Sequence, residues 1–313
     1  MIENVLFTVM LAVVGVAFGS FVNALVWRLR KQQEREEATA LEKGSEVVKQ
    51  VARRVKHAVT GTQDEGDDYS ISRGRSMCPN CHHQLAARDL VPIFSWLWLR
   101  GKCRYCKKPI SVQYPLVEIA VGTLFVISYL CWPDKLTYWY DWMDLAFWLA
   151  YVVLLAALFI YDLRWYILPD KLVWTLVGLA LLQLAIHVIF AFDNTQRFDI
   201  LQMAVYGLLP ISGLYWVIYM FSRGRMVGFG DVKLGIFMGL VLGWQKALMA
   251  LLFANLIGGI IVFPLLLLGK LKRDSRVPFG PMLIAAFFIA GLWGDQLILW
   301  YLAGHFSLLW FGL

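Results

Sequence analysis

Two aspartates lie beside apolar segments that are long enough to cross a lipid bilayer. Asp231 ends the motif Gly-Phe-Gly-Asp at 228–231, and Asp162 directly follows the apolar run 148–161. A carboxylate at membrane depth is costly, so it usually lies in a water-filled or protein-lined site and marks a function. The glycines let a backbone approach Asp231 closely, because they carry no Cβ. The pattern points to aspartyl chemistry inside a membrane, although two unrelated helix-end acids at the headgroup level would also produce it.

Four cysteines form the second group that could do chemistry. They occur as two Cys-x-x-Cys pairs, Cys78 with Cys81 and Cys103 with Cys106. Two such pairs indicate a zinc site, because each short loop presents two thiolates to one tetrahedral ion. With four cysteine ligands no coordination position stays open, so the metal should hold the fold and not react. Iron is an alternative to zinc, and two disulfides are a weaker alternative in a reducing cytoplasm.

The composition excludes an ordinary soluble domain, since 59% of the 313 residues are hydrophobic and only 16% are charged. Stretches of roughly 20 apolar residues indicate membrane spans. We therefore expect an all-α polytopic membrane protein with about eight transmembrane helices. The expected spans are 4–27, 115–132, 143–161, 172–192, 201–221, 232–244, 247–268 and 281–303. The first is too long for a removable signal peptide and lacks a basic start, and a break near Trp244 separates the sixth from the seventh.

The basic residues predict the orientation of these spans. Three of them lie in 28–31, directly after the first span, which places that end in the cytoplasm. If the spans alternate from there, all but three of the 29 Lys and Arg are cytoplasmic and both chain ends are outside. Asp162 and Asp231 then share the cytoplasmic leaflet. The net charge of +7 is explained by anionic inner-leaflet lipid as a partner, without nucleic acid.

One large non-membrane region follows the first span. Valines at helical spacing predict a surface helix from residue 32 to about 59, broken near Gly44, and the acidic stretch 61–68 is expected to be a solvated linker. The expected division of the chain is a first transmembrane helix (1–30), a charged cytoplasmic insert (31–76), a small cytoplasmic four-cysteine zinc-binding domain (77–113) and a seven-helix membrane domain with the aspartyl site (114–313).

Taken together, these motifs resemble the bacterial type IV prepilin peptidases, the leader peptidase/N-methyltransferases, which are intramembrane aspartyl proteases of the GxGD type. Several motifs stand in the family's order: Gly-Ser-Phe-Val-Asn at 19–23, the cysteine region 78–118, Asp162 to Asp170, Gly228 to Lys233, and Pro-Phe-Gly-Pro at 278–281. The chain departs from the family at Gln113, where arginine is common, and in the length of the segment 32–76.

The resemblance implies a function at the bacterial cytoplasmic (inner) membrane. Asp162 and Asp231 match the catalytic pair, which cleaves the basic leader from type IV prepilins and pseudopilins at the cytoplasmic face. It also implies N-methylation of the newly exposed residue, with S-adenosylmethionine as the donor. The sequence shows no glycine-rich loop between a strand and a helix that would locate this donor.

In an aspartyl pair, one ionised carboxylate activates water and one protonated carboxyl polarises the peptide carbonyl. Asp170 is the alternative to Asp162 as the first catalytic aspartate, but its place after Pro169 suits a helix-start acid or an ion pair. Glu118 is expected to be an acid in the first turn of the second span, with a role in methyl transfer or substrate handling as the alternative.

Other functions fit the residues less well. A peptidase without methyltransferase activity needs only the two aspartates. A non-catalytic scaffold that docks pilus or secretion proteins through its zinc domain leaves the two acids no reason to share a leaflet. A proton-coupled transporter usually has its acids near the bilayer midplane, whereas these lie at span ends.

Overall fold

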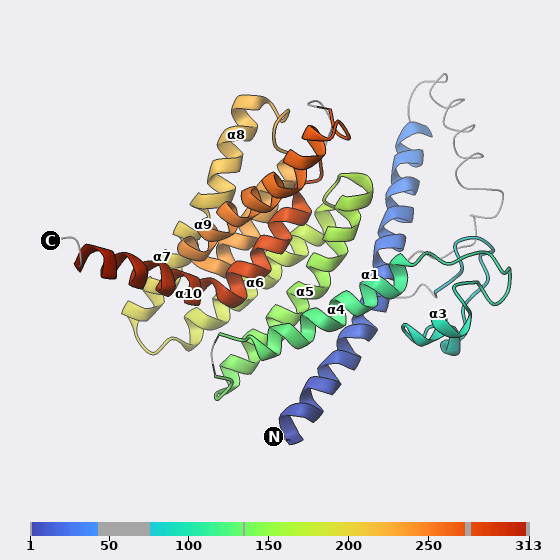
Figure 1. Cartoon of the computed structure of the whole chain (residues 1–313), viewed down its shortest axis with the longest axis horizontal. Helices are drawn as coiled ribbons and strands as arrows, with labels where there is room; N and C mark the ends of the chain where they lie inside the picture. Colours follow the sequence, from blue (N-terminus) through green and yellow to red (C-terminus); the bar gives the residue numbers. More distant parts are fainter. Residues whose placement is uncertain (1, 43–75, 134, 273–276, 311–313) are drawn as a thin grey trace. The chain divides into compact units, whose positions relative to one another are not determined.

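The computed structural model describes residues 2–42, 76–133, 135–272 and 277–310, and almost all of its regular structure is helical (Figure 1). Seven helical segments of the described chain are long and apolar enough to cross a membrane. They are Asn4–Thr39, Gln113–Leu130, Trp139–Trp165, Asp170–Phe190, Asn194–Ser222, Phe229–Leu267 and Gly280–Tyr301. The expectation of an all-α polytopic membrane protein is confirmed. The chain divides into two compact units, Met1–Leu124 and Phe125–Leu313.

Seven segments stand where about eight spans were expected, because the expected spans 232–244 and 247–268 share one label, α9 (Phe229–Leu267), which consists of two helices joined at a kink. Its backbone leaves the helical region at Gly243, with φ 68° and ψ 175°. The break expected near Trp244 therefore exists, but no loop separates the two parts. A helix of 39 residues would be about 58 Å long, and the hydrocarbon core is about 30 Å thick. The element is long enough for two crossings.

In the first unit, helix α1 (Ile2–Glu42) continues without interruption beyond its apolar part. The expected first span and the start of the expected surface helix are thus one helix. The rest of that surface helix, with Gly44, and the linker 61–68 lie outside the described residues.

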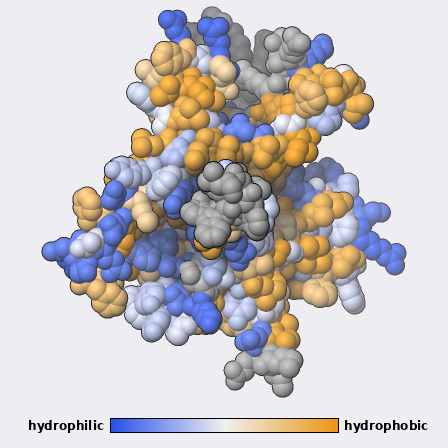
Figure 2. Space-filling view, turned by 60° about the vertical axis from the view of Figure 1, so that its left-hand side comes forward, coloured by the Kyte–Doolittle hydropathy of each residue, from blue (hydrophilic) through white to orange (hydrophobic). Residues whose placement is uncertain are grey.

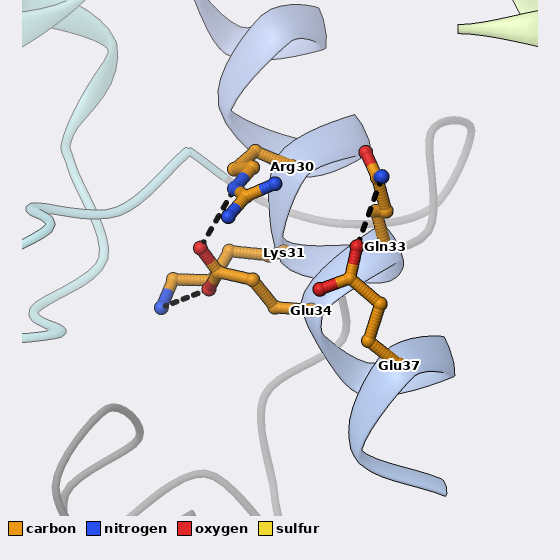
Figure 3. A network of polar contacts seen from close by, with 5 residues as sticks. All are labelled: Arg30, Lys31, Gln33, Glu34 and Glu37. Carbon is orange, nitrogen blue, oxygen red and sulfur yellow. Dashed lines mark hydrogen bonds and ion pairs between the residues drawn. The ribbon is translucent and has the colours of Figure 1, made fainter. Parts of the chain in front are cut away.

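Side-chain pairs at helical spacing stabilise the polar end of α1 (Figure 3). Glu34 accepts from Arg30 at 2.9 Å and pairs with Lys31 at 3.2 Å. The amide of Gln33 donates to Glu37 at 3.0 Å. Pairs three or four residues apart lie on one face of a helix and each contribute about 0.2–0.5 kcal/mol, which favours helix where the sequence is no longer apolar.

Small and polar residues bring α1 close to α4 (Gln113–Leu130). A Cβ on Gly19 would lie 2.5 Å from the Cα of Glu118, and a Cβ on Gly122 would lie 2.6 Å from Val16. The buried amide of Asn23 donates to the carbonyl oxygen of Tyr114 at 3.1 Å. Close approach at glycines together with an interhelical hydrogen bond is typical of helix pairs in membranes.

The second unit contains most of the membrane helices. They are α5 (Trp139–Trp165), α6 (Asp170–Phe190), α7 (Asn194–Gly207), the π-helical turn η3 (Leu209–Gly213), α8 (Leu214–Ser222), α9 and α10 (Gly280–Trp310). The long helix α9, orange in Figure 1, packs against α6, α7, α8 and α10. It is therefore the element around which this unit is organised.

An aromatic core joins α5, α9 and α10. The ring of Phe237 lies 5.0 Å from that of Tyr151 and 5.2 Å from that of Phe287, and Trp148 stacks on Phe287 at 5.0 Å between ring centroids. The four residues are buried. Since lipid tails are as apolar as these rings, close packing and not exclusion from water holds such helices together.

Many large apolar side chains of the second unit are exposed, among them Leu256, Ile260 and Phe263 on α9. Figure 2 shows one face on which apolar side chains (orange) are open to the surroundings over large areas, beside groups of polar ones (blue). A soluble protein rarely exposes so much apolar surface. This distribution agrees with helices that face lipid.

Candidate functional site

Asp162 lies in the last turn of α5 and is only 5% exposed. The helix ends four residues later at Tyr166, whose left-handed backbone (φ 57°) lets its N–H donate to the Asp162 carbonyl oxygen at 2.9 Å. The carboxylate is thus held inside the helix bundle, next to the point where the chain leaves it.

Asp231 lies in the first turn of α9 and is partly exposed. Its Oδ2 accepts a hydrogen bond from the N–H of Gly228 at 3.3 Å. A carboxylate at this end of a helix is favoured by the helix dipole. By accessible surface Asp162 is buried, whereas Asp231 keeps a partly accessible surface.

The segment before α10 supplies a third part of the site. The N–H of Gly280 donates to Oδ2 of Asp162 at 3.1 Å, across 118 positions of sequence. A Cβ on Gly280 would lie 2.6 Å from that oxygen. Residue 280 must therefore be glycine if this hydrogen bond is to keep its geometry. The sequence marked 278–281 as a motif but not this contact, because every residue except proline has an N–H.

Leu168 lies between the start of α9 and the segment before α10, and it follows the Asp162 end of α5 in the chain. It is 9% exposed. A Cβ on Gly230 would lie 3.1 Å from it, and a Cβ on Gly280 would lie 3.3 Å from it. The carboxylates of Asp162 and Asp231 lie close enough to interact electrostatically. The structure thus brings the two predicted acids into one site.

Asp170, the rival acid, has a different environment. It starts α6, its side chain is 65% exposed, and it pairs with Lys233 at 2.6 Å. The ammonium group of Lys233 also lies 5.0 Å from the centroid of the Phe229 ring. Asp170 is therefore a helix-start acid in an ion pair, as its position after Pro169 suggested.

Tyr215 on α8 is a buried polar residue that sequence reasoning did not select. It is 4% exposed, and its ring lies edge-on to Phe279 at 5.9 Å. Its hydroxyl has no hydrogen-bond partner of good geometry among the described residues, and it faces Asn255 and Asp231. It is a buried hydroxyl beside the second aspartate.

The four cysteines of the first unit lie in two turns of the same construction. In the first turn the N–H of His82 donates to the Cys78 oxygen at 2.9 Å, and in the second the N–H of Lys107 donates to the Cys103 oxygen at 3.0 Å. His82 and Lys107 both have positive φ, 55° and 59°. One antiparallel bridge closes each turn, Met77 with Gln84 and Lys102 with Pro109. Each turn directs two sulfur atoms to the same side.

The sulfur atoms are spaced for one metal ion. All four Sγ atoms lie within 4.8 Å of one another, and those of Cys78 and Cys106 are 3.9 Å apart. Ligands about 2.3 Å from a tetrahedral zinc ion lie about 3.8 Å apart, whereas disulfide sulfurs are about 2.05 Å apart. All the cysteines are free thiols. These residues can therefore hold a metal.

The two innermost thiols differ in acidity. Burial raises the pKa of Cys78 to about 12. Burial acts in the same direction on Cys103, but hydrogen bonds from the N–H groups of Cys106 and Tyr105 outweigh it and lower the pKa of Cys103 to about 7. A thiolate ligand is thus present near neutral pH, and a cation that binds there must release protons from the other thiols.

An ion pair fastens the second turn to the short helix η2 (Ala87–Asp89). Asp89, whose side chain is 3% exposed, accepts from Arg104 at 2.7 Å and from the hydroxyl of Tyr105 at 3.1 Å. Burial opposes ionisation of Asp89, but these two hydrogen bonds keep the pKa of its carboxyl below the usual range.

Glu118 is buried, at 6% exposed, five residues after α4 begins. Its Oε2 accepts from the N–H of Ile93 at 2.7 Å. The expected position in the first turn was therefore slightly too early, because the helix starts at Gln113. The carboxylate ties the cysteine region to a membrane helix.

Comparison with known proteins identifies both halves of the chain. Residues 149–263 match the model of the type IV leader peptidase family, and residues 13–132 match the bacterial peptidase A24 N-terminal domain. A prepilin leader peptidase/N-methyltransferase of Aeromonas hydrophila is 35% identical over 287 residues, 91% of this chain and 90% of the relative. Proteins of the same name from Stutzerimonas stutzeri (93% and 92%) and Pseudomonas aeruginosa (92% and 91%) are each 33% identical.

The chain belongs to the type IV leader peptidase family. The expected resemblance is thus confirmed, and with the seven apolar helices it makes the protein a multi-pass inner membrane protein. The two aspartates lie within the leader peptidase region and the four cysteines within the N-terminal one. A comparison with solved structures gave no match.

Proposed function

We propose that this protein is an aspartic endopeptidase that removes the basic leader from type IV prepilins and pseudopilins at the cytoplasmic face of the inner membrane. The observation that carries the proposal is the convergence of Asp162 and Asp231, from opposite ends of two helices, on one site in a chain of the leader peptidase family. The exposure of Asp170 and its ion pair with Lys233 support the choice of Asp162 over Asp170.

Asp162 and Asp231 act together in peptide hydrolysis. Two neighbouring carboxylates do not both ionise easily, so the pair shares one proton. The ionised member takes a proton from water, and the protonated member hydrogen-bonds to the peptide carbonyl. Gly280 fixes the rotamer of Asp162 through its N–H. The proton belongs to the pair, so neither acid is assigned a fixed role.

The metal of the cysteine cluster is proposed to be zinc. The sulfur spacing and the four-thiolate set support a closed tetrahedral site, which supplies folding energy and not a reactive centre. In this proposal the domain 77–113 is structural, and the membrane domain 114–313 carries the peptidase site.

We further infer that the protein methylates the new N-terminus of the cleaved pilin, because its relatives are named N-methyltransferases as well as leader peptidases. S-Adenosylmethionine supplies the methyl group in this proposal. Methyl transfer needs a deprotonated amine aligned with the donor, and a proton-sharing pair of acids is not required for that alignment.

The test is cleavage of a prepilin by purified protein. Asp162→Asn and Asp231→Asn are each expected to lose activity by about a thousandfold or more, a scale seen when one member of a catalytic group is removed. Asp170→Asn is the matched control, since it removes a nearby acid outside the pair. Near-normal processing by either of the first two variants would exclude the pair.

A second substrate separates the two activities. Asp231→Asn protein is expected to methylate a pre-cleaved pilin whose mature N-terminus is already exposed. Loss of this methylation in a folded variant would show that both reactions use one site.

A further inference from the structure

The cysteine region exposes a cluster of apolar side chains, which we name the α3 patch. Trp98 is 84% exposed, Phe94 73% and Leu97 57%. Leu90 and Val91, just before them in the chain, complete the patch at 40% and 45%. A small domain gains little stability from such side chains in water, and clusters of this kind usually mark an interaction surface.

The way α3 (Phe94–Trp98) is fixed explains why these side chains point outward. Trp96 is the residue that α3 turns toward the domain. Its ring lies against Gly101, where a Cβ would be 3.0 Å away, and its Nε1 donates to the carbonyl oxygen of Ile110 at 3.2 Å. With Trp96 held inward, Phe94, Leu97 and Trp98 cannot face the same interior.

The patch is fastened beside a membrane helix. The N–H of Ile93, directly before α3, donates to Glu118 at 2.7 Å. Ile93 has a φ of 59°, which is rare for a β-branched residue. Glu118 lies five residues inside α4, about 7.5 Å from its start. The segment before α3 is thus tied to the N-terminal part of α4.

The charge of the cysteine region suits an anionic surface. Between residues 77 and 112 there are six basic residues and one acid, Asp89, which pairs with Arg104. The other five basic residues are exposed: Arg88, Arg100, Lys102, Lys107 and Lys108. Basic side chains close to an anionic leaflet are attracted to it.

We propose that the α3 patch inserts into the headgroup region of the bilayer and that anionic lipid is its partner. The patch has the chemistry of an interfacial anchor, with tryptophan, phenylalanine and leucine flanked by basic side chains. Anchored in this way, the cysteine domain lies on the membrane surface at a fixed depth. This inference does not depend on the aspartyl pair.

Photo-crosslinking of the full chain tests the proposal. Benzoylphenylalanine is placed at Phe94 or at Trp98, and the protein is reconstituted in phosphatidylcholine vesicles with or without phosphatidylglycerol. The matched control is the same label at Tyr105, an aromatic residue of this domain that is 38% exposed and packs on His83. Bound metal, measured for each labelled protein, shows that the domain has folded.

The expected result is several-fold more lipid adduct at positions 94 and 98 than at 105, increasing with phosphatidylglycerol. Lipid adducts at 94 and 98 no more abundant than at 105 would overturn the proposal. Adducts confined to protein would also overturn it. If added prepilin displaces the lipid adducts and is itself crosslinked, the patch is a substrate surface and the lipid assignment is wrong.

Discussion

The four-cysteine cluster and the aspartyl site are assembled over very different lengths of chain. Cys78 and Cys106, whose sulfur atoms are 3.9 Å apart, are separated by 28 positions. Asp162 and the N–H that holds its carboxylate are separated by 118. The cluster needs two local turns, whereas the aspartyl site needs α5, α9 and the start of α10 to pack correctly. All ligands of a local site such as the cysteine cluster can be recognised in the sequence. In a site assembled from distant segments, such as the aspartyl site, only the acids can be recognised.

The largest expected effect is the loss of metal from the cluster. Cys103→Ser removes the most acidic of the two buried thiols. Structural zinc contributes about 10–16 kcal/mol of binding free energy in zinc-finger peptides, so the variant should lose tightly bound metal. Elemental analysis measures the metal, and hydrogen exchange should show deprotection of residues 77–110.

The matched control is Cys131→Ser, which replaces a free cysteine outside the cluster and should keep one metal ion per chain. The amides of the Phe125–Leu313 unit should keep their protection in both variants. Loss of protection there after Cys103→Ser would mean that the two regions do not fold independently.

The next effect is expected in the aspartyl site without any change of an acid. Gly280→Ala places a Cβ 2.6 Å from Oδ2 of Asp162, so the carboxylate must move. A displacement of about 1 Å in a catalytic group can cost about a hundredfold in rate. Prepilin cleavage should fall by this factor, while the metal content stays unchanged.

Two further glycine variants calibrate this result. Gly230→Ala meets only the side chain of Leu168, at 3.1 Å, which can shift, so its loss should be smaller. A Cβ on Gly259 meets nothing within 4 Å, and Gly259→Ala should be fully active. Equal activity in Gly280→Ala and Gly259→Ala would mean that the Gly280 contact does not position Asp162.

The same contrast explains which features could be predicted. The two aspartates stood out because a carboxylate beside an apolar run is rare, and the cysteines because their spacing repeats. The break in α9 was predicted near 244–246 and lies at Gly243. Gly280 as a donor was missed, because a backbone N–H leaves no trace in residue type. Leu168 and Tyr215 were missed because leucine and tyrosine are common in any membrane bundle.

The two helices of α9 were predicted as separate spans, but the way in which they join was not. Gly243, with its positive φ, joins them without a polar loop. The continuous helix α1 was also missed. Charged residues after Trp27 indicated a separate element, but their pairs at helical spacing extend the same helix.

A smaller effect is expected at the ion pair that supports the cluster. Asp89 is ionised at neutral pH, because hydrogen bonds from Arg104 and Tyr105 outweigh burial and keep its pKa low. Asp89→Asn should destabilise the cysteine domain by about 1.5–3 kcal/mol, the range for hydrogen bonds to a charged group. Hydrogen exchange of residues 77–110 at pH 7 measures the loss, with the metal retained.

A double-mutant cycle with Arg104→Gln checks the cause. The two changes should together cost less than the sum of the single changes, because both remove the same pair. Additive effects would show that Asp89 acts through the Tyr105 hydroxyl alone.

The smallest effect is expected at Asp170, although this acid stands only eight positions after Asp162 in the same motif. Its side chain is 65% exposed, and exposed ion pairs contribute about 0–1 kcal/mol. Asp170→Asn should therefore leave both thermal stability and prepilin cleavage close to wild type. Lys233→Gln should lower thermal stability slightly more, because this side chain is only 12% exposed and covers Phe229.

The cleavage rate of Asp170→Asn, compared with that of Asp162→Asn, decides which acid belongs to the site. If Asp170→Asn is as inactive as Asp162→Asn, burial and the Gly280 hydrogen bond are the wrong criteria for choosing between two nearby acids. If it is active, these two features identify the catalytic acid where the motif alone offers both.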